Sequence, residues 1–275
     1  MRRLVQLAAV ALTLTVAPAA AGVGPSMPAI DGGTGVASPA GNVSYSTVLD
    51  GTNTTLRVLS DGELLRSASV TGLWGVPMVT VNGGLGGLST NGGVLVLSDN
   101  VQPSGTLRSR SRFAVVDTKT LSVSRLVSLP GDFSFDALSP KGATLFLIDH
   151  ISQKDVTNYQ VRAYDLKAGR LLPRVIADKT QKSWVMSGMP VSRATSKDGR
   201  WVYTLYQQSD NYPFIHALNT TSKTAICIGL PWNWAASNSG ISTAAMKLVG
   251  SRLQITGGHG STTSFRLDTK TFRIT

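Results

Sequence analysis

The chain has 275 residues, with 26 Lys and Arg against 15 Asp and Glu, and a formal net charge of +11. Charged residues make up only 15%, and Glu63 is the only glutamate, which excludes a mainly helical protein because Glu and Lys normally fill exposed helix faces. The apolar content of 42% excludes a disordered chain, and the lone Cys227 excludes a disulfide scaffold.

The N-terminus has the pattern of a secretory signal peptide over residues 1–21. Arg2 and Arg3 precede a mostly apolar stretch, and small residues follow up to Ala21. The stretch is short for a bilayer span, and the alternative is an uncleaved anchor. We expect an extracytoplasmic protein, secreted, periplasmic or bound to the cell wall, with no stable membrane insertion after signal cleavage. Residues 22–41 are rich in Gly, Pro and Ala and predict a flexible leader.

Two turn patterns then recur about every fifty residues. The first joins a Ser or Thr, a turn glycine and an alternating strand, and it stands at residues 88–96, 138–147 and 195–203, with a degraded copy at 246–255. The second places a polar turn after a short strand, centred on Ser60, Asp117, Asp165, Asn219 and Asp268. Asp, Asn and Gly at hairpin tips accept positive φ or cap their own backbone. Each period therefore predicts two hairpins.

Two hairpins make a four-stranded sheet, which cannot bury both of its faces alone. Successive sheets must then stack around an axis. We predict an all-β chain, a β-propeller of about five four-stranded blades, with six as the alternative, that occupies residues 42–275 as a single domain. A β-sandwich does not explain the regular step.

At residues 115–121 and 138–146 the chain resembles the YVTN or lactonase-like, WD40-like β-propeller repeat family. The resemblance covers most of residues 40–275. It implies the fold and says little about activity, since this architecture hosts many functions. Lactonase-type members that use calcium place acidic and amide ligands in the channel, and no such set can be matched residue by residue here. The Gly-His and Trp-Asp signature of WD40 blades is missing.

Aromatic residues cluster in the segments that connect successive cycles. Such side chains can ring one face of a propeller and stack on a ligand such as a sugar. The alternative is packing between neighbouring sheets. The candidate ligand-binding residues are Trp74, Trp184, Trp232, Asn233, Trp234 and Asn238, and the segment from Pro231 to Asn238 is the best candidate rim.

Three arginines, Arg108, Arg110 and Arg112, alternate along the chain. In a strand, alternate side chains point to one face, so this stripe is a candidate anion-binding site for a phosphate or carboxylate polymer. The alternative is a solvated sheet edge. We expect no nucleic acid as a partner, because basic and aromatic residues are not interleaved.

The remaining titratable residues favour structural roles. His150, His216 and His259 have no second ligand at a recognisable metal spacing, and Cys227 lies in an apolar segment. We therefore assign no catalytic residue, metal or cofactor. The sequence favours a secreted, non-catalytic binding protein whose partner is a protein, a glycan or an anionic cell-envelope polymer. The alternative is an extracytoplasmic hydrolase of the lactonase-like propeller type, with His150 or His259 beside several Asp at the channel mouth.

Overall fold

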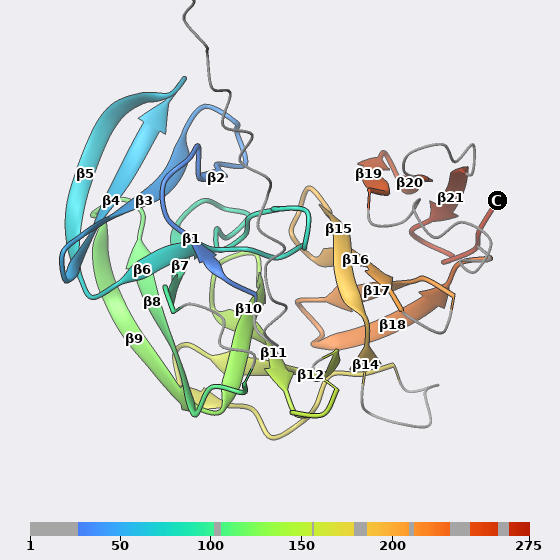
Figure 1. Ribbon diagram of the computed structural model, residues 1–275. Coiled ribbons are helices and arrows are strands. Elements are labelled where there is room, and N and C mark those ends of the chain that lie inside the picture. Colours follow the sequence, from blue (N-terminus) through green and yellow to red (C-terminus); the bar gives the residue numbers. More distant parts are fainter. Residues whose placement is uncertain are drawn as a thin grey trace, which may run out of the picture.

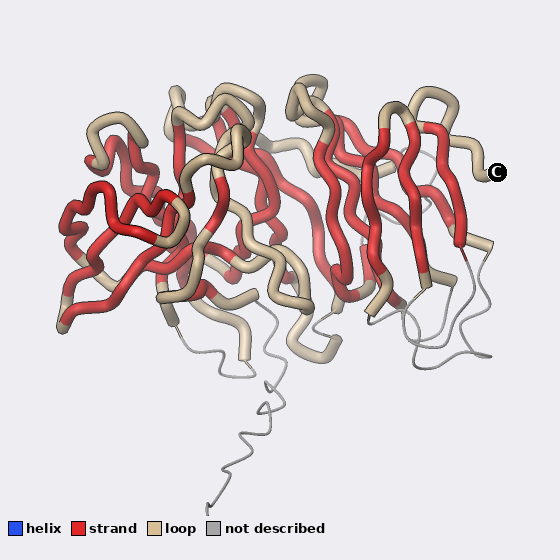
Figure 2. The backbone as a smooth tube through the Cα atoms, turned by 90° about the horizontal axis from the view of Figure 1, so that it is seen from above, coloured by secondary structure: helices blue, strands red, loops and turns tan. Residues whose placement is uncertain are grey.

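The computed structural model describes residues 27–101, 106–155, 157–178, 186–208, 212–231, 243–257 and 264–275. They form five antiparallel sheets set one after another along an arc (Figure 1 and Figure 2). The predicted all-β propeller fold is confirmed, and the number of sheets agrees with the predicted five blades. Within these ranges no helix is long and apolar enough to cross a membrane.

The sheets follow the chain in order, and neighbouring strands within each are antiparallel. The first contains β2 (Val36–Ala37), β3 (Ser44–Asp50), β4 (Asn53–Ser60) and β5 (Glu63–Thr71). The second contains β1 (Ala29–Ile30), β6 (Trp74–Pro77), β7 (Val94–Asp99), β8 (Arg110–Asp117) and β9 (Ser122–Pro130). The third contains β10 (Asp132–Leu138), β11 (Thr144–His150), β12 (Asn158–Asp165) and β13 (Arg170–Leu171), with β14 (Met186–Ser187) paired to β12. The fourth contains β15 (Met189–Thr195), β16 (Trp201–Gln207), β17 (Phe214–Asn219) and β18 (Thr224–Gly229), and the fifth contains β19 (Ala245–Val249), β20 (Arg252–Thr256) and β21 (Ser264–Asp268).

Strands β1 and β2 come from the segment for which the composition predicts a flexible leader. Ala29 pairs with Pro77 in the second sheet, and Val36 pairs with Tyr45 in the first. Gly35 has a positive φ, and a Cβ there would lie 1.9 Å from the carbonyl oxygen of Tyr45, so this approach requires glycine. The folded domain therefore begins before residue 42. Two short apolar pairs, Ala29–Ile30 and Val36–Ala37, are enough to add edge strands, which composition alone does not reveal.

The first repeated turn has the same hydrogen bonds in three sheets. The side chains of Ser89, Ser139 and Ser196 each accept a hydrogen bond of 2.9 Å from the backbone N–H five residues further on. The glycine inside each turn, Gly92, Gly142 or Gly199, has a positive φ, which glycine adopts without steric cost. The turn chemistry expected from the sequence is present at each of these hairpins.

The second repeated turn is built around an Asp or Asn. The Oδ1 atoms of Asp117, Asn219 and Asp268 accept hydrogen bonds from the backbone N–H groups two and three residues further on. The fifth residue of each turn adopts a positive φ, and these residues are Leu121, Gly169, Lys223 and Phe272. Side chains other than glycine tolerate this conformation poorly, so the capping bonds and the strand pairing hold these turns in place.

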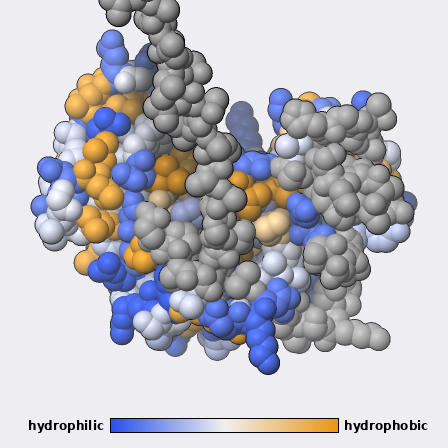
Figure 3. Space-filling model, in the orientation of Figure 1, coloured by the Kyte–Doolittle hydropathy of each residue, from blue (hydrophilic) through white to orange (hydrophobic). Residues whose placement is uncertain are grey.

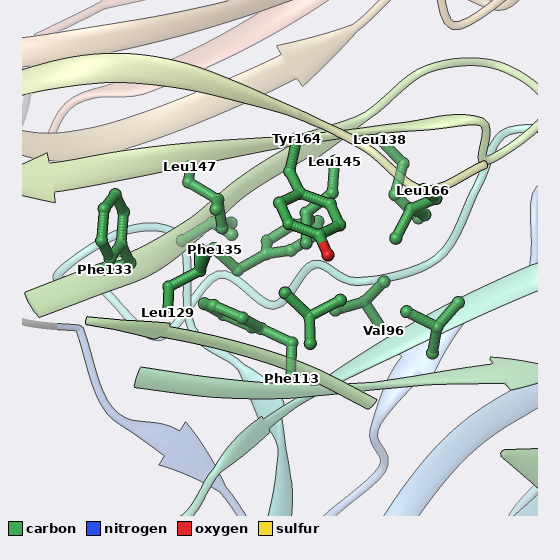
Figure 4. Packing of buried hydrophobic residues seen from close by; sticks show 13 residues of the cluster. Val96, Phe113, Leu129, Phe133, Phe135, Leu138, Leu145, Leu147, Tyr164 and Leu166 are labelled. Atoms are coloured by element: carbon green, nitrogen blue, oxygen red, sulfur yellow. The ribbon is translucent and has the colours of Figure 1, made fainter. Parts of the chain in front are cut away.

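The three middle sheets bury both faces. Four apolar clusters join the five sheets in series. In β7, Leu95 and Leu97 pack against the first sheet, whereas Val96 between them packs against the third. Figure 4 shows this second interface, where Val96 and Phe113 face Leu147 across the gap between the sheets. Burial on both faces explains why the strands of the middle sheets are nearly continuous apolar runs.

The last sheet buries only one face. Leu253 and Ile255 of β20 are fully buried against the fourth sheet, whereas the alternate residues Arg252, Gln254 and Thr256 are exposed. Among the residues described, no apolar cluster joins the first sheet to the last, and the two lie at opposite ends of the arc in both backbone views (Figure 1 and Figure 2). The strict alternation of polar and apolar residues in β20 is what a half-solvated strand requires.

Exposed apolar side chains gather on the outer strands of the first two sheets. Leu64 and Leu65 of β5 and Leu126 of β9 are exposed. In Figure 3, apolar atoms lie at the left of the view over these sheets, and hydrophilic atoms dominate the lower margin.

Candidate functional site

Four charged side chains meet where β8 begins, in a group that we call the arginine cluster: Arg108, Arg112, Asp99 and Asp132. The Arg108 side chain donates to Asp132 at 2.9 Å, to Asp99 at 3.2 Å and to the carbonyl of Phe133. The side chain of Asp132 is 0% exposed and that of Asp99 is 5% exposed. The attraction within such buried ion pairs is little screened by water, and it offsets the cost of removing the charges from water.

The candidate anion-binding stripe is therefore largely neutralised. Arg112 lies 3.5 Å from Asp99, and its guanidinium stands 5.6 Å from the centre of the Trp74 ring. Arg110 is exposed and donates to Ser128 at 3.0 Å. Arg110 and Arg112 share one face of β8, as expected, but Arg108 precedes the strand and turns inward to the aspartates. Whether any of the three binds an anion stays a prediction.

Trp74 is a core residue. It is 3% exposed, it packs between the first and second sheets, and its Nε1 donates to the carbonyl of Thr71 at 2.7 Å. Packing between sheets, the alternative expected from the sequence, describes this residue better than a binding rim. The other candidate rim residues, Trp184, Trp232, Asn233, Trp234 and Asn238, lie outside the described residues, as does His259.

The described histidines are buried, and Cys227 is partly buried. His150 is bonded to the Ser134 hydroxyl at 3.0 Å. Burial lowers the pKa of His216 to about 4 and raises the pKa of the Cys227 thiol to about 12. The Cys227 sulfur lies 3.7 Å from Nδ1 of His216, its cross-strand partner. Both groups are neutral at pH 7, so this pair is not an activated thiolate.

A cavity of about 550 Å³ lies where the inner edges of four sheets meet, and we call it the central cavity. Its lining comes mainly from residues Val36, Ala37, Pro39 and Ala40, from residues 85–90 and 135–138, and from Arg193, Thr195, Ser196 and Lys197. The lining combines apolar walls with hydroxyl groups, a mixture that is typical of small-ligand sites. The cavity contacts each of the first four sheets.

An ion pair forms part of the wall of the central cavity. Arg193 of β15 donates to both the carboxylate and the carbonyl of Asp136 in β10. Asp136 is 3% exposed and sits where the register between β10 and β11 shifts. Such a β-bulge re-aims a side chain, and here the carboxylate meets the next sheet. The pair fastens the third sheet to the fourth beside the cavity.

Neither Asp136 nor Arg193 belongs to the candidate sites that the sequence patterns indicate. One signal was present: Asp136 is an acid inside the buried strand from Phe133 to Leu138, and a buried carboxylate requires a partner. The partner is 57 residues away in the chain, so the sequence alone does not identify it. His150, expected to meet several Asp at the channel mouth in a hydrolase, is absent from the residues that line the central cavity.

No protein-family model matches the chain, and no curated protein matches it. Several solved structures are similar to the chain. BamB from Moraxella catarrhalis is similar with a TM-score of 0.52 and 15% identity, over 92% of this chain and 66% of that one. An acylaminoacyl peptidase in complex with Z-Gly-Gly-Phe-chloromethyl ketone has a TM-score of 0.51 and 11% identity, over 86% of this chain and 37% of that one.

TolB from Acinetobacter baumannii has a TM-score of 0.46 and 13% identity, over 90% of this chain and 53% of that one. The chain therefore spans between 37% and 66% of the length of these three structures. BamB is a β-propeller protein. The fold is a β-propeller. At such low identity the likeness extends to the fold alone, because propellers host unrelated functions.

Proposed function

We propose that this protein is an exported β-propeller of the YVTN, lactonase-like repeat type that binds a ligand or partner without converting it. The N-terminal order of basic, apolar and small residues supports export. The repeated turns support the repeat type, since the residues that carry the resemblance form the predicted hairpins. The partner is a protein, a glycan or an anionic polymer of the cell envelope.

The central cavity is the observation that carries this proposal. Its volume of about 550 Å³ lies within the range of about 300–1,000 Å³ that small-ligand pockets occupy. In its wall Asp136 and Arg193 bond to each other, and Lys197 is a further cation of the lining. Charges that neutralise each other in this way position the sheets and shape the cavity, whereas proton transfer requires a group that is poised toward the substrate.

A substitution at the cavity mouth tests the binding role. Ala40 lines the cavity and is exposed, so Ala40→Trp fills the mouth at little cost in stability. Ala143 is also exposed, lies in a turn outside the lining and provides the matched control, Ala143→Trp. We expect a ligand found on an array of polysaccharides and peptides to bind the wild type and Ala143→Trp equally and to lose about tenfold in affinity for Ala40→Trp, equivalent to about 1.4 kcal/mol.

A turnover assay tests the absence of catalysis. Purified protein is incubated with lactones and esters, with and without added calcium, and product is measured by chromatography. We expect no hydrolysis above that of buffer. Hydrolysis that requires the folded protein and is lost in Ala40→Trp would overturn the proposal in favour of a lactonase-like hydrolase.

A further inference from the structure

A second concave site lies between the fourth and fifth sheets, next to the central cavity. It has a volume of about 540 Å³ and is formed by hairpin turns of both sheets around Trp201, so we call it the Trp201 groove. Residues 195–198 and Arg200 line one side, and Ser251, Thr269 and Lys270 line the other. Hydroxyl groups and cationic side chains thus surround one aromatic ring.

Three cations border the groove: Lys197, Arg200 and Lys270. Neither lysine forms an ion pair with any residue that the structure describes. The single acid, Asp198, is engaged by its own turn, because its Oδ1 accepts from the Ser196 hydroxyl at 2.6 Å and from the backbone of Arg200 at 3.0 Å. The Arg200 side chain lies 3.9 Å from the other carboxylate oxygen, with both side chains about 60% exposed, a contact that solvent screens. The groove is therefore net positive.

Trp201 supplies an aromatic surface that is held in place. Its ring stacks on Tyr203, with centroids 6.1 Å apart and planes 12° apart, and Phe272 meets it edge-on at 5.4 Å. The side chain is only partly buried. A fixed indole with free surface suits the apolar face of a sugar ring, because little side-chain entropy is lost on binding.

We propose that the Trp201 groove binds an anionic polysaccharide, with acidic groups on Lys197, Arg200 and Lys270 and a sugar ring on Trp201. The hydroxyl group of Ser251 can accept or donate hydrogen bonds to sugar hydroxyls, whereas that of Thr269 donates to the carbonyl of Ser251 at 2.8 Å and can accept from a sugar hydroxyl. This site goes beyond the proposed function of the central cavity. The groove shares residues 195–197 with that cavity. Its aromatic surface, Trp201, and two of its cations, Arg200 and Lys270, do not line the cavity.

The test compares two double variants with the same change in charge. Arg200→Ala/Lys270→Ala removes two groove cations, and Lys247→Ala/Arg266→Ala removes two exposed cations on the opposite face of the last sheet. Binding of polygalacturonate is measured by titration calorimetry. We expect about a tenfold loss of affinity for the first variant and less than about twofold for the second. Equal losses would overturn the proposal, because attraction would then follow net charge alone.

A second pair of measurements isolates the sugar. Trp201→Leu keeps an apolar side chain, and its fold is checked by circular dichroism; we expect about a fivefold loss for polygalacturonate and an unchanged dependence on salt. Poly-L-glutamate carries carboxylates without sugar rings. We expect it to bind the wild type more weakly than polygalacturonate does, and to bind Trp201→Leu with the same affinity as it binds the wild type. Equal affinity for the two polymers in the wild type would contradict the polysaccharide class. Ala40→Trp should leave polygalacturonate binding unchanged, which separates this site from the central cavity.

Discussion

The arginine cluster and the Trp201 groove each gather cationic side chains, yet their charges have different surroundings. In the cluster, Arg108 and Arg112 meet Asp99 and Asp132, whose side chains are at most 5% exposed. Among the described residues that line the groove, the one acid is Asp198, whose side chain is 62% exposed and bonded to its own turn. Buried acids fix and neutralise neighbouring cations, whereas an exposed acid leaves them available to a ligand. The spacing of cations along the chain therefore does not reveal which of them are available.

The largest expected effect is at Asp132. Asp132→Asn keeps the shape of the side chain and leaves the Arg108 guanidinium with a weakened partner in a buried position. Breaking a buried pair from one side costs about 3 kcal/mol, and we expect the free energy of unfolding to fall by that amount in urea denaturation at pH 7. Asp198→Asn in the groove is the control, with an expected change below about 0.5 kcal/mol. Similar losses at both positions would remove the distinction between the two regions.

His216 extends the comparison to a buried base between the third and fourth sheets. Burial lowers the pKa of His216 to about 4, with Asp136, Arg193 and Asp178 as the nearby charges. Between these two pKa values the unfolded chain, with a histidine pKa of about 6.5, binds a proton at this residue and the folded chain does not. Stability is therefore lost as the pH falls from about 6.5 toward 4, by about 3 kcal/mol. Urea denaturation at several pH values measures the slope.

His216→Gln is the matched variant for this slope. It removes the titrating group and keeps a polar side chain at the same position, so the change in stability between pH 7 and pH 5 should become smaller than in the wild type. Aspartates titrate at lower pH in the unfolded chain, which keeps this range informative. An unchanged slope in His216→Gln would assign the acid sensitivity to other groups.

A substitution at Thr220 tests how much this residue stabilises the turn that carries the groove residue Arg200. Its hydroxyl donates to the carbonyls of Gly199 at 2.8 Å and Arg200 at 3.1 Å, and the residue is 1% exposed. Thr220→Val keeps the shape and leaves these carbonyls without that donor, so we expect a loss of about 1 kcal/mol in the free energy of unfolding. Thr221→Val, at the exposed neighbour, should change stability by less than about 0.5 kcal/mol. Equal effects would indicate a general response of the turn to valine.

The parts of the fold that the sequence predicts are those set within a few residues. Asp117 and Ser139 bond to backbone groups two to five residues away, so the turns and the strands between them follow from local chemistry. The step between copies then implies stacked sheets. The number of sheets follows in the same way.

The sites depend instead on contacts between residues that are far apart in the sequence, which local patterns do not predict. Arg108 meets Asp132 across 24 residues, and Arg193 meets Asp136 across 57. The Trp201 groove exists only because two turns about 70 residues apart, around Lys197 and Lys270, are adjacent once the sheets stack. Alternation correctly placed Arg110 and Arg112 on one face, and it could not predict that Arg108 would turn inward, because the acids that hold it come from other strands.

The smallest expected effect is at Arg110. It tests whether the three arginines of the stripe contribute to stability as one electrostatic unit or only through the pairs with buried acids. Arg110 is exposed, with one hydrogen bond of 3.0 Å to Ser128, so Arg110→Ala should change the free energy of unfolding by less than about 0.5 kcal/mol. Arg108→Ala, two residues away, leaves Asp132 buried without its cation and should cost several times more. If both variants lost the same stability, the three arginines would act as one electrostatic unit. Suppose instead that Arg108→Ala lowers the free energy of unfolding by about 1.4 kcal/mol more than Arg110→Ala does, a tenfold difference in the unfolding equilibrium constant. That result would show that the stability contributed by the stripe comes from its pairing with the buried acids.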